Sequence, residues 1–152
     1  WDFGTVLKIP ILFKTVIFCK LKVYVRRKLI MIKCGTDIIE VGRIKEALEK
    51  KGFKGRVYTE NEIKYCEDKN MQKYQSYSGR FAAKEAIFKA LTDIIENKYK
   101  IKWTDFEILN DKSGKPYVNI NAENIKKLEI KNIELSISHC KEYATAVCIV
   151  EL

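Results

Sequence analysis

The sequence is poor in the residues that build metal and disulfide sites. It contains one histidine, His139, and its five cysteines are odd in number and include no C-x-x-C pair. A zinc site is therefore not expected, and free thiols in a reducing cytoplasm are the simplest interpretation. Long apolar runs are also missing, because no stretch approaches the ~18–20 residues that a membrane-spanning helix requires. We expect a cytoplasmic protein without a membrane span.

The P-loop, G-x-G-x-x-G, H-E-x-x-H and G-x-S-x-G motifs are absent as well, so any ligand site is not one of the common nucleotide-binding designs. What the sequence does contain is positive charge, most of it near the beginning. The net charge is +9, and residues 1–30 hold seven basic residues and one acidic residue, a net of +6. Residues 31–152 therefore carry only +3. This weak excess is not the footprint of a nucleic-acid-binding domain, but it suits a phosphate-bearing ligand or an acidic protein partner.

The first thirty residues are unlike the rest of the chain. They do not begin with Met, lysines interrupt their apolar runs, and the pattern is not that of a secretory signal. A strand pair, a membrane-surface segment and a targeting peptide are open interpretations. A translated leader is another, since a purine-rich codon run for Arg26-Arg27-Lys28 would place a ribosome-binding site just before Met31. We treat residues 1–30 as an N-terminal extension and residues 31–152 as the domain.

The patterns after Met31 are those of one α+β domain. Strands are expected at 31–39, 105–111, 116–120, 133–139 and 143–152. Helices are expected at 40–52, from about Tyr74 to Glu96, and at 121–128. A further helix is expected to begin at the capping box Thr59-x-x-Glu62. Gly52 is the expected stop of the first helix, and Ser113-Gly114 is the expected hairpin turn. This order predicts a largely antiparallel sheet packed on a long central helix.

Two charged residues lie among the apolar residues of the long helix. At 100° per residue, apolar side chains occupy almost every bearing of the stretch SGRFAAKEAIFKAL, which predicts a largely buried helix. Glu85 and Lys89 are one turn apart within it. An i,i+4 salt bridge, worth roughly 0.3–0.5 kcal/mol, is the structural interpretation, and a shared ligand is the functional one.

Asp37 and His139 also admit two interpretations. Asp37 lies in an otherwise apolar strand, and an unpaired buried carboxylate is costly, so it needs either a structural partner or a ligand. His139, between a strand and a turn, is more often structural when considered alone. Two carboxylates from separate elements suit Mg²⁺, which takes one or two protein carboxylates and leaves other positions to water and phosphates. Lys89, one turn from Glu85, can meet the same phosphates.

Four stretches carry a resemblance to a known family. GTDIIEVGRI, GRFAAKEAIFKAL, DKSGKPYV and SISHCKEYATA resemble, in order and spacing, the motifs of the bacterial holo-acyl-carrier-protein synthases, the small phosphopantetheinyl transferases. The resemblance covers residues 31–152 and implies the 4′-phosphopantetheinyl transferase-like fold. It also implies a reaction: transfer of 4′-phosphopantetheine from coenzyme A to a serine of acyl carrier protein, as part of fatty acid biosynthesis. Adenosine 3′,5′-bisphosphate is the other product.

The resemblance assigns roles residue by residue. Asp37 and Glu85 are expected to hold Mg²⁺, and Lys89 to stabilise charge on the leaving phosphate. For the serine proton, a water on the metal is the first expected acceptor and Glu85 the second. The substrate-binding residues are expected to be Arg80 and His139 at the nucleotide end, and Gly114 and Pro116 beside the adenine. Cys140 departs from the family, in which Thr, Asp or Asn often follows the histidine.

The resemblance also implies partners. Arg43, on the basic helix that follows Asp37, is expected to dock the acidic carrier protein, and the family implies a homotrimer with active sites between subunits. Nucleic acid and membrane are not expected partners. Two rival functions are a non-catalytic basic module that binds RNA or another polyanion, and a Mg²⁺-dependent hydrolase of nucleotide diphosphates. The first rival leaves Asp37 and Glu85 unexplained, because carboxylates repel phosphate without a metal.

Overall fold

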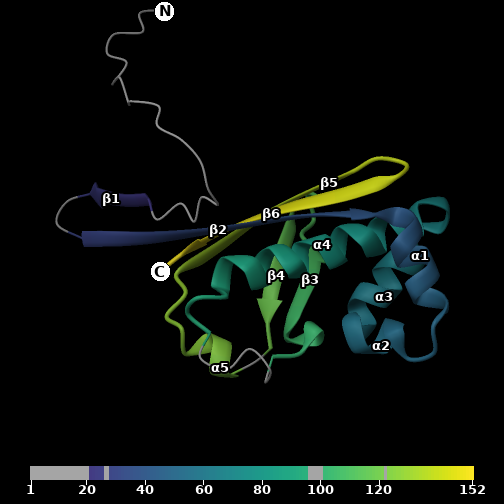
Figure 1. The fold of residues 1–152 in the computed structure, drawn as a ribbon, viewed down its shortest axis with the longest axis horizontal. Coiled ribbons are helices and arrows are strands. Elements are labelled where there is room, and N and C mark those ends of the chain that lie inside the picture. Colours follow the sequence, from purple (N-terminus) through teal and green to yellow (C-terminus); the bar gives the residue numbers. More distant parts are fainter. Residues whose placement is uncertain (1–20, 26–27, 96–100, 122) are drawn as a thin grey trace, which may run out of the picture.

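We describe the protein from a computed structural model, which defines residues 21–25, 28–95, 101–121 and 123–152 (Figure 1). The elements follow in the order β1 (Leu21–Val25), β2 (Lys28–Glu40), α1 (Val41–Glu49), α2 (Phe53–Val57), α3 (Glu60–Glu67), η1 (Asn70–Gln72), α4 (Lys73–Leu91), η3 (Trp103–Asp105), β3 (Phe106–Asn110), β4 (Pro116–Ile120), α5 (Glu123–Lys126), β5 (Asn132–His139) and β6 (Tyr143–Glu151). Among the described helices, none is both long and apolar enough to cross a membrane.

The larger sheet has the strand order β1-β2-β6-β5, with every neighbouring pair antiparallel. Helix α4 runs along one face of this sheet and packs on β2 and β6 (Figure 1). The β3–β4 hairpin forms a second, two-stranded sheet whose strand β4 lies beside β5. The α+β architecture expected from the sequence, with an antiparallel sheet on a long central helix, is confirmed.

Helix α4 is largely buried, as its apolar wheel predicts. Its alanines Ala82, Ala83, Ala86 and Ala90 are almost completely inaccessible to solvent. Small side chains let the helix backbone approach β2 so closely that Gly35 has no room for a side chain. A Cβ placed on Gly35 would lie 2.0 Å from the carbonyl oxygen of Ala86. The glycine of the GTD stretch is therefore required by packing, two residues before Asp37.

Most of the expected local structure is present, with three differences. The capping box is formed, since the Thr59 side chain accepts from the Glu62 backbone and the Glu62 side chain accepts from the Thr59 backbone. However, α1 ends at Glu49, and Gly52, with φ of 81°, instead precedes the short helix α2. Helix α4 ends at Leu91, and the expected end at Glu96 falls outside the described residues.

The third difference concerns the N-terminal extension. Strand β1 pairs with residues 28–32, so β2 begins before Met31 and the last part of the extension joins the edge of the sheet. Residues 1–20 lie outside the described residues. The boundary at Met31 stays a prediction.

The contact between α4 and β2 generates a stability prediction. Gly35→Ala should lower the free energy of unfolding by about 2–3 kcal/mol, because the added methyl group meets backbone atoms that cannot rotate away. Gly42→Ala in α1 is the matched control, since no atom of the described residues lies within 4 Å of its Cβ. This control should be neutral or stabilising by up to about 1 kcal/mol. Urea unfolding of both variants checks the prediction, and equal stability of the two would contradict the packing account.

Candidate active site

Three of the predicted residues meet beside the open edge of β2. Lys89 donates from Nζ to Asp37 Oδ1 at 2.8 Å and to the Thr36 carbonyl oxygen at 3.0 Å. The Asp37 side chain is 15% exposed and that of Lys89 is 51% exposed, so the carboxylate is mostly covered while the ammonium faces solvent. We call Asp37, Glu85 and Lys89 the carboxylate cluster. Of the two interpretations of Glu85 and Lys89, the intrahelical salt bridge is not formed among the described residues, and Lys89 instead forms an ion pair with Asp37 on β2.

The backbone around Asp37 is fixed by side-chain hydrogen bonds across the sheet. Thr145 donates from Oγ1 to the Asp37 carbonyl oxygen at 2.8 Å, and Thr36 donates from Oγ1 to the Ala146 carbonyl oxygen at 3.0 Å. Asp37 is also directly opposite Ala146 in the β2–β6 register. The strand thus presents the Asp37 side chain toward α4 at a defined position.

Glu85 is held in a partly apolar environment. Burial raises the pKa of its carboxyl group, the nearby Asp37 raises it further, and Lys89 opposes both effects. Phe81 and Phe88 lie one turn away on the same side of α4, and Trp103 packs on both rings, with ring centroids 5.0 and 5.4 Å away. Two carboxylates that repel each other and contain hard oxygen ligands are a suitable pair for a divalent cation.

These two carboxylates are the candidate metal ligands. No group of three or more His, Cys, Asp or Glu side chains able to hold a metal occurs among the described residues. Mg²⁺ commonly takes only one or two protein carboxylates and keeps water or phosphate at its other positions. Asp37 and Glu85 are therefore the residues that could hold such an ion.

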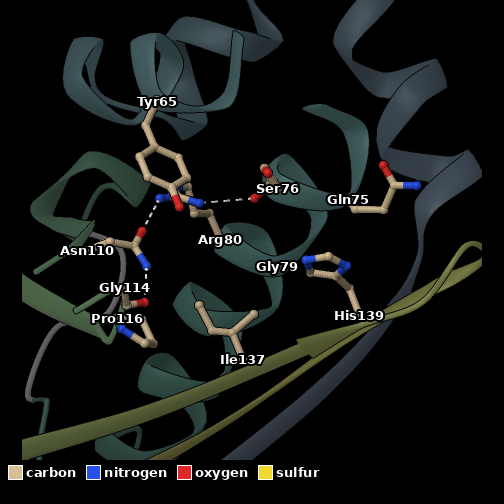
Figure 2. A pocket seen from close by; sticks show the side chains of 10 residues that line it. All are labelled: Tyr65, Gln75, Ser76, Gly79, Arg80, Asn110, Gly114, Pro116, Ile137 and His139. Atoms are coloured by element: carbon tan, nitrogen blue, oxygen red, sulfur yellow. Dashed lines mark hydrogen bonds between the residues drawn. The ribbon is translucent and has the colours of Figure 1, made fainter. Parts of the chain in front are cut away.

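A separate cavity of about 210 Å³ contains the predicted substrate-binding residues (Figure 2). We call it the arginine pocket, and its walls come from α3, α4, the β3–β4 hairpin and β5. The residues that line it are Tyr65, Gln75, Ser76, Gly79, Arg80, Asn110, Gly114, Pro116, Ile137 and His139. All four residues expected at the nucleotide end, Arg80, Gly114, Pro116 and His139, thus lie in one cavity.

Arg80 is the central cation of this pocket. It is only 4% exposed and donates from Nη2 to Asn110 Oδ1 at 2.6 Å and from Nη1 to the Ser76 carbonyl oxygen at 3.5 Å. The Tyr65 ring covers the guanidinium, with its centroid 4.0 Å from the central carbon. Figure 2 shows Arg80 between Tyr65 and Asn110. In the part of the chain that the structure describes, no residue accepts a hydrogen bond from Arg80 Nε.

The cluster and the pocket lie on different sides of the same helix. Arg80 precedes Glu85 by five residues, which corresponds to a rotation of about 140° and a rise of about 7.5 Å along α4. Asp37 is on β2 and His139 is on β5, and β6 lies between these strands, which are therefore roughly 9–10 Å apart. One chain thus presents the two sets of predicted residues on strands β2 and β5, with β6 between them.

Six lining residues were not predicted from the sequence: Tyr65, Gln75, Ser76, Gly79, Asn110 and Ile137. Tyr65 lies in α3 and Asn110 at the end of β3, and neither has a local pattern that distinguishes it from a structural residue. One signal was available, since Asn110 directly precedes the DKSGKPYV stretch.

Beneath the pocket, a buried ion pair ties α3 to α4. Lys84 and Glu62 are fully buried, and Lys84 Nζ lies 2.8 Å from Glu62 Oε2. Lys84 also donates to the carbonyl oxygens of Val57 and Trp103, and Glu62 Oε1 accepts from the Ile108 backbone. Because these charges are satisfied by hydrogen bonds, the pair positions α3 and β3 rather than serving a ligand.

The predicted docking residue is on the surface. Arg43 is exposed on α1, which follows directly after β2, and Lys45, Lys50 and Lys51 are exposed nearby. This basic surface therefore begins a few residues after Asp37.

The chain is similar to known proteins over most of its length. A family model described as ACPS, the 4′-phosphopantetheinyl transferase superfamily, matches residues 33–148. The chain is 48% identical over 124 residues to a holo-[acyl-carrier-protein] synthase of Ruminiclostridium cellulolyticum, covering 78% of this chain and 90% of that protein. It is 47% identical over 121 residues to a holo-[acyl-carrier-protein] synthase of Clostridium tetani, covering 77% and 93%.

Two solved structures are similar over the same region. A holo-(acyl-carrier-protein) synthase of Bacillus anthracis in complex with CoA (3′,5′-ADP) is 36% identical, with a TM-score of 0.64, covering 78% of this chain and 95% of that one. A holo-[acyl-carrier-protein] synthase of Helicobacter pylori in complex with coenzyme A is 30% identical, with a TM-score of 0.67, covering 77% and 98%.

The electrostatics of the carboxylate cluster generate a titration prediction. Asp37→Asn should lower the pKa of Glu85, because it removes the negative charge that opposes ionisation. Lys89→Met should raise the pKa of Glu85, because it removes the compensating positive charge. Carboxyl-detected NMR titrations in metal-free buffer measure both shifts. Shifts of the same sign in the two variants would contradict this arrangement of charges.

Proposed function

The chain belongs to the 4′-phosphopantetheinyl transferase superfamily, and on this premise we propose that it works as a holo-[acyl-carrier-protein] synthase in the cytoplasm. In this reaction, a serine hydroxyl of the acyl carrier protein attacks the β-phosphorus of coenzyme A. The bond from that phosphorus to the bridging oxygen breaks, and adenosine 3′,5′-bisphosphate leaves with the oxygen. The holo carrier protein then feeds fatty acid biosynthesis. We assign the transferase domain to residues 31–152, which contain the matched region 33–148.

One observation carries the proposal, namely the buried and uncompensated charge of Arg80 in a pocket that also contains Gly114, Pro116 and His139. A buried cation without an ion pair favours an anionic ligand, because the anion replaces the favourable interactions with water that the guanidinium loses on burial. Gly114, in the hairpin turn, has a φ of 89° and no side chain, so its backbone faces the pocket directly. The nucleotide end of coenzyme A has the charge and the flat base that such a pocket accommodates.

Asp37 and Glu85 fit the magnesium ion that the family implies. They come from separate elements, their mutual repulsion contributes to the raised pKa of Glu85, and both supply hard oxygen ligands. When bound, Mg²⁺ supplies positive charge that neutralises the diphosphate of the substrate.

The residues of the chain supply the remaining chemistry. Lys89 presents a half-exposed ammonium group that Asp37 and the Thr36 carbonyl oxygen hold in place, so it can contact the leaving phosphate without a large rearrangement. The serine proton is proposed to pass to a water at the site, with the Glu85 carboxylate as the second candidate acceptor.

Each complete site is proposed to form between subunits of a homotrimer. The separation of the carboxylate cluster from the arginine pocket supports this, since within one chain they lie on strands that β6 separates and on different sides of α4. The outer face of the sheet supports it as well, because Ile38, Tyr143, Val147 and Ile149 point away from α4 and are 66%, 44%, 38% and 45% exposed. Burying such a face against another copy removes apolar area from water.

The carrier protein is proposed to dock on α1. Arg43 is exposed there, and the surrounding lysines make the surface positive, which complements an acidic partner and raises its rate of association. The same helix begins directly after the strand that contains Asp37, so a docked carrier would be near the carboxylate cluster.

The experiment that tests the function is incubation of the protein with coenzyme A, Mg²⁺ and apo carrier protein, followed by mass spectrometry of the carrier. We expect the carrier to gain one phosphopantetheine group. Cleavage of coenzyme A without modification of the carrier would indicate the hydrolase instead. Binding of RNA and other polyanions without any cleavage would indicate the non-catalytic module.

The metal assignment gives a mutational prediction. Asp37→Ala or Glu85→Ala should reduce transfer to background while the fold is retained, because each variant loses one of two protein ligands. Glu85→Gln should fail as well, since the neutral amide no longer offsets the charge of the cation. The mass assay and circular dichroism measure the two effects. Full Mg²⁺-dependent activity of either alanine variant would contradict the assignment of Mg²⁺ to these two residues.

The docking assignment gives a kinetic prediction. Arg43→Glu should raise KM for the carrier about tenfold at low salt and leave KM for coenzyme A nearly unchanged, because two negative surfaces then repel. The defect should shrink as salt shortens the Debye length from about 10 Å at 0.1 M. Steady-state kinetics at two salt concentrations measure this. An unchanged carrier KM at low salt would exclude α1 from the docking surface.

A further inference from the structure

We propose that Asn110 is a positioning residue, which holds the Arg80 guanidinium for a phosphate group of the ligand while leaving the charge of Arg80 uncompensated. This inference rests on the proposed function, because it takes coenzyme A as the ligand of the arginine pocket. It adds to the substrate site a residue that does not itself need to touch the substrate.

The Asn110 amide joins two walls of the arginine pocket. Its Oδ1 accepts from Arg80 Nη2 at 2.6 Å, and its Nδ2 donates to the Gly114 carbonyl oxygen at 2.9 Å (Figure 2). Arg80 is on α4 and Gly114 is in the turn of the β3–β4 hairpin. One side chain therefore fixes the position of the cation relative to the turn on the opposite side of the cavity.

The charge of Arg80 is not neutralised by its surroundings. Within the described residues, each carboxylate in an ion pair is paired with a lysine, and Arg80 is in none of these pairs. Burial raises the pKa of the neighbouring Cys66 thiol to about 12, so that sulfur stays protonated and cannot act as a counter-ion. The remaining contacts are a backbone carbonyl, the Asn110 amide and the face of the Tyr65 ring. All of them are neutral.

A carboxylate is available next to Asn110 but is turned away. Asp111 Oδ1 accepts from the hydroxyl and backbone of Ser113 and from the Lys115 backbone, so this carboxylate is used to form the hairpin turn. The neutral amide points to Arg80 and the charged side chain points to the loop. Because a carboxylate at position 110 would form a charge-assisted pair with Arg80, it would compete directly with the phosphate of a ligand.

The Arg80 guanidinium has a donor without a partner in the described part of the chain. Arg80 Nε is buried and has no partner among the described residues, although a guanidinium has five N–H donors in a fixed plane. Tyr65 on one face and Asn110 at the edge keep that plane in one orientation. A phosphate in the cavity would therefore meet a guanidinium that the fold has already oriented.

The test compares Asn110→Asp with Asn110→Ala in the full chain. Calorimetry measures binding of adenosine 3′,5′-bisphosphate, and steady-state kinetics measure KM for coenzyme A and for the carrier. Asn110→Ala should weaken nucleotide binding about threefold, because orientation is lost but the charge is kept. Asn110→Asp should weaken it about thirtyfold, because the introduced carboxyl neutralises Arg80. KM for the carrier should change less than twofold in both variants.

The outcomes separate this inference from the proposed function. If the unaltered protein neither binds the bisphosphate nor modifies the carrier, the proposed function fails. If it does both, but the two Asn110 variants bind nucleotide equally well, Asn110 has only a structural role and the inference is overturned. Thermal unfolding supplies the control, since a structural role predicts that affinity falls in proportion to stability.

Tyr65 provides a second route if the Asn110 variants do not fold. Tyr65→Phe keeps the ring over Arg80 and should raise KM for coenzyme A less than Tyr65→Leu does. Tyr65→Leu removes the ring and should raise that KM about fivefold. Equal effects of the two substitutions would contradict orientation of Arg80 by its neutral neighbours.

Discussion

The close contact between α4 and β2 is the constraint on which the rest of the structure depends. The absence of a side chain at Gly35 lets β2 approach the Ala86 and Ala90 backbone, and only at this distance can Asp37 on the strand pair with Lys89 on the helix. The same helix buries its alanines against the sheet and still presents charged residues along its sides. A small residue at one position thus determines whether the two halves of the carboxylate cluster meet.

The charged residues of α4 illustrate how a buried helix can be both core and site. Lys84 is satisfied by Glu62 and by backbone carbonyl oxygens, and it connects α4 to the elements around it. Arg80, almost equally buried, makes its hydrogen bonds and its ring contact with neutral groups in the described chain. Since burial costs both cations their hydration, the difference in partners distinguishes a structural lysine from an arginine prepared for an anion.

Local patterns in the sequence were sufficient for much of the fold. The capping box at Thr59, the hairpin around Gly114 and the apolar wheel of α4 depend on neighbouring residues, and each is present in the structure. The pairing of Lys89 with Asp37 joins residues 52 positions apart, so no local rule favours it over the i,i+4 pair with Glu85. Tyr65 and Asn110 enter the pocket only through packing of α3 and the hairpin on α4. The roles of Asp37, Glu85, Lys89 and Arg80 were inferred from the resemblance to the family, and their positions in the fold do not by themselves establish those roles.

The central claim is that one substrate molecule uses the carboxylate cluster of one subunit and the arginine pocket of another. It is tested most directly by co-expressing Asp37→Ala and Arg80→Ala chains with different affinity tags and isolating the mixed oligomer. Each variant alone should be inactive in carrier modification. The isolated mixed trimer should regain about one active site in three, because each ring that contains both variants has a single junction that pairs an intact cluster with an intact pocket. A mixed oligomer that forms but stays inactive would contradict the account.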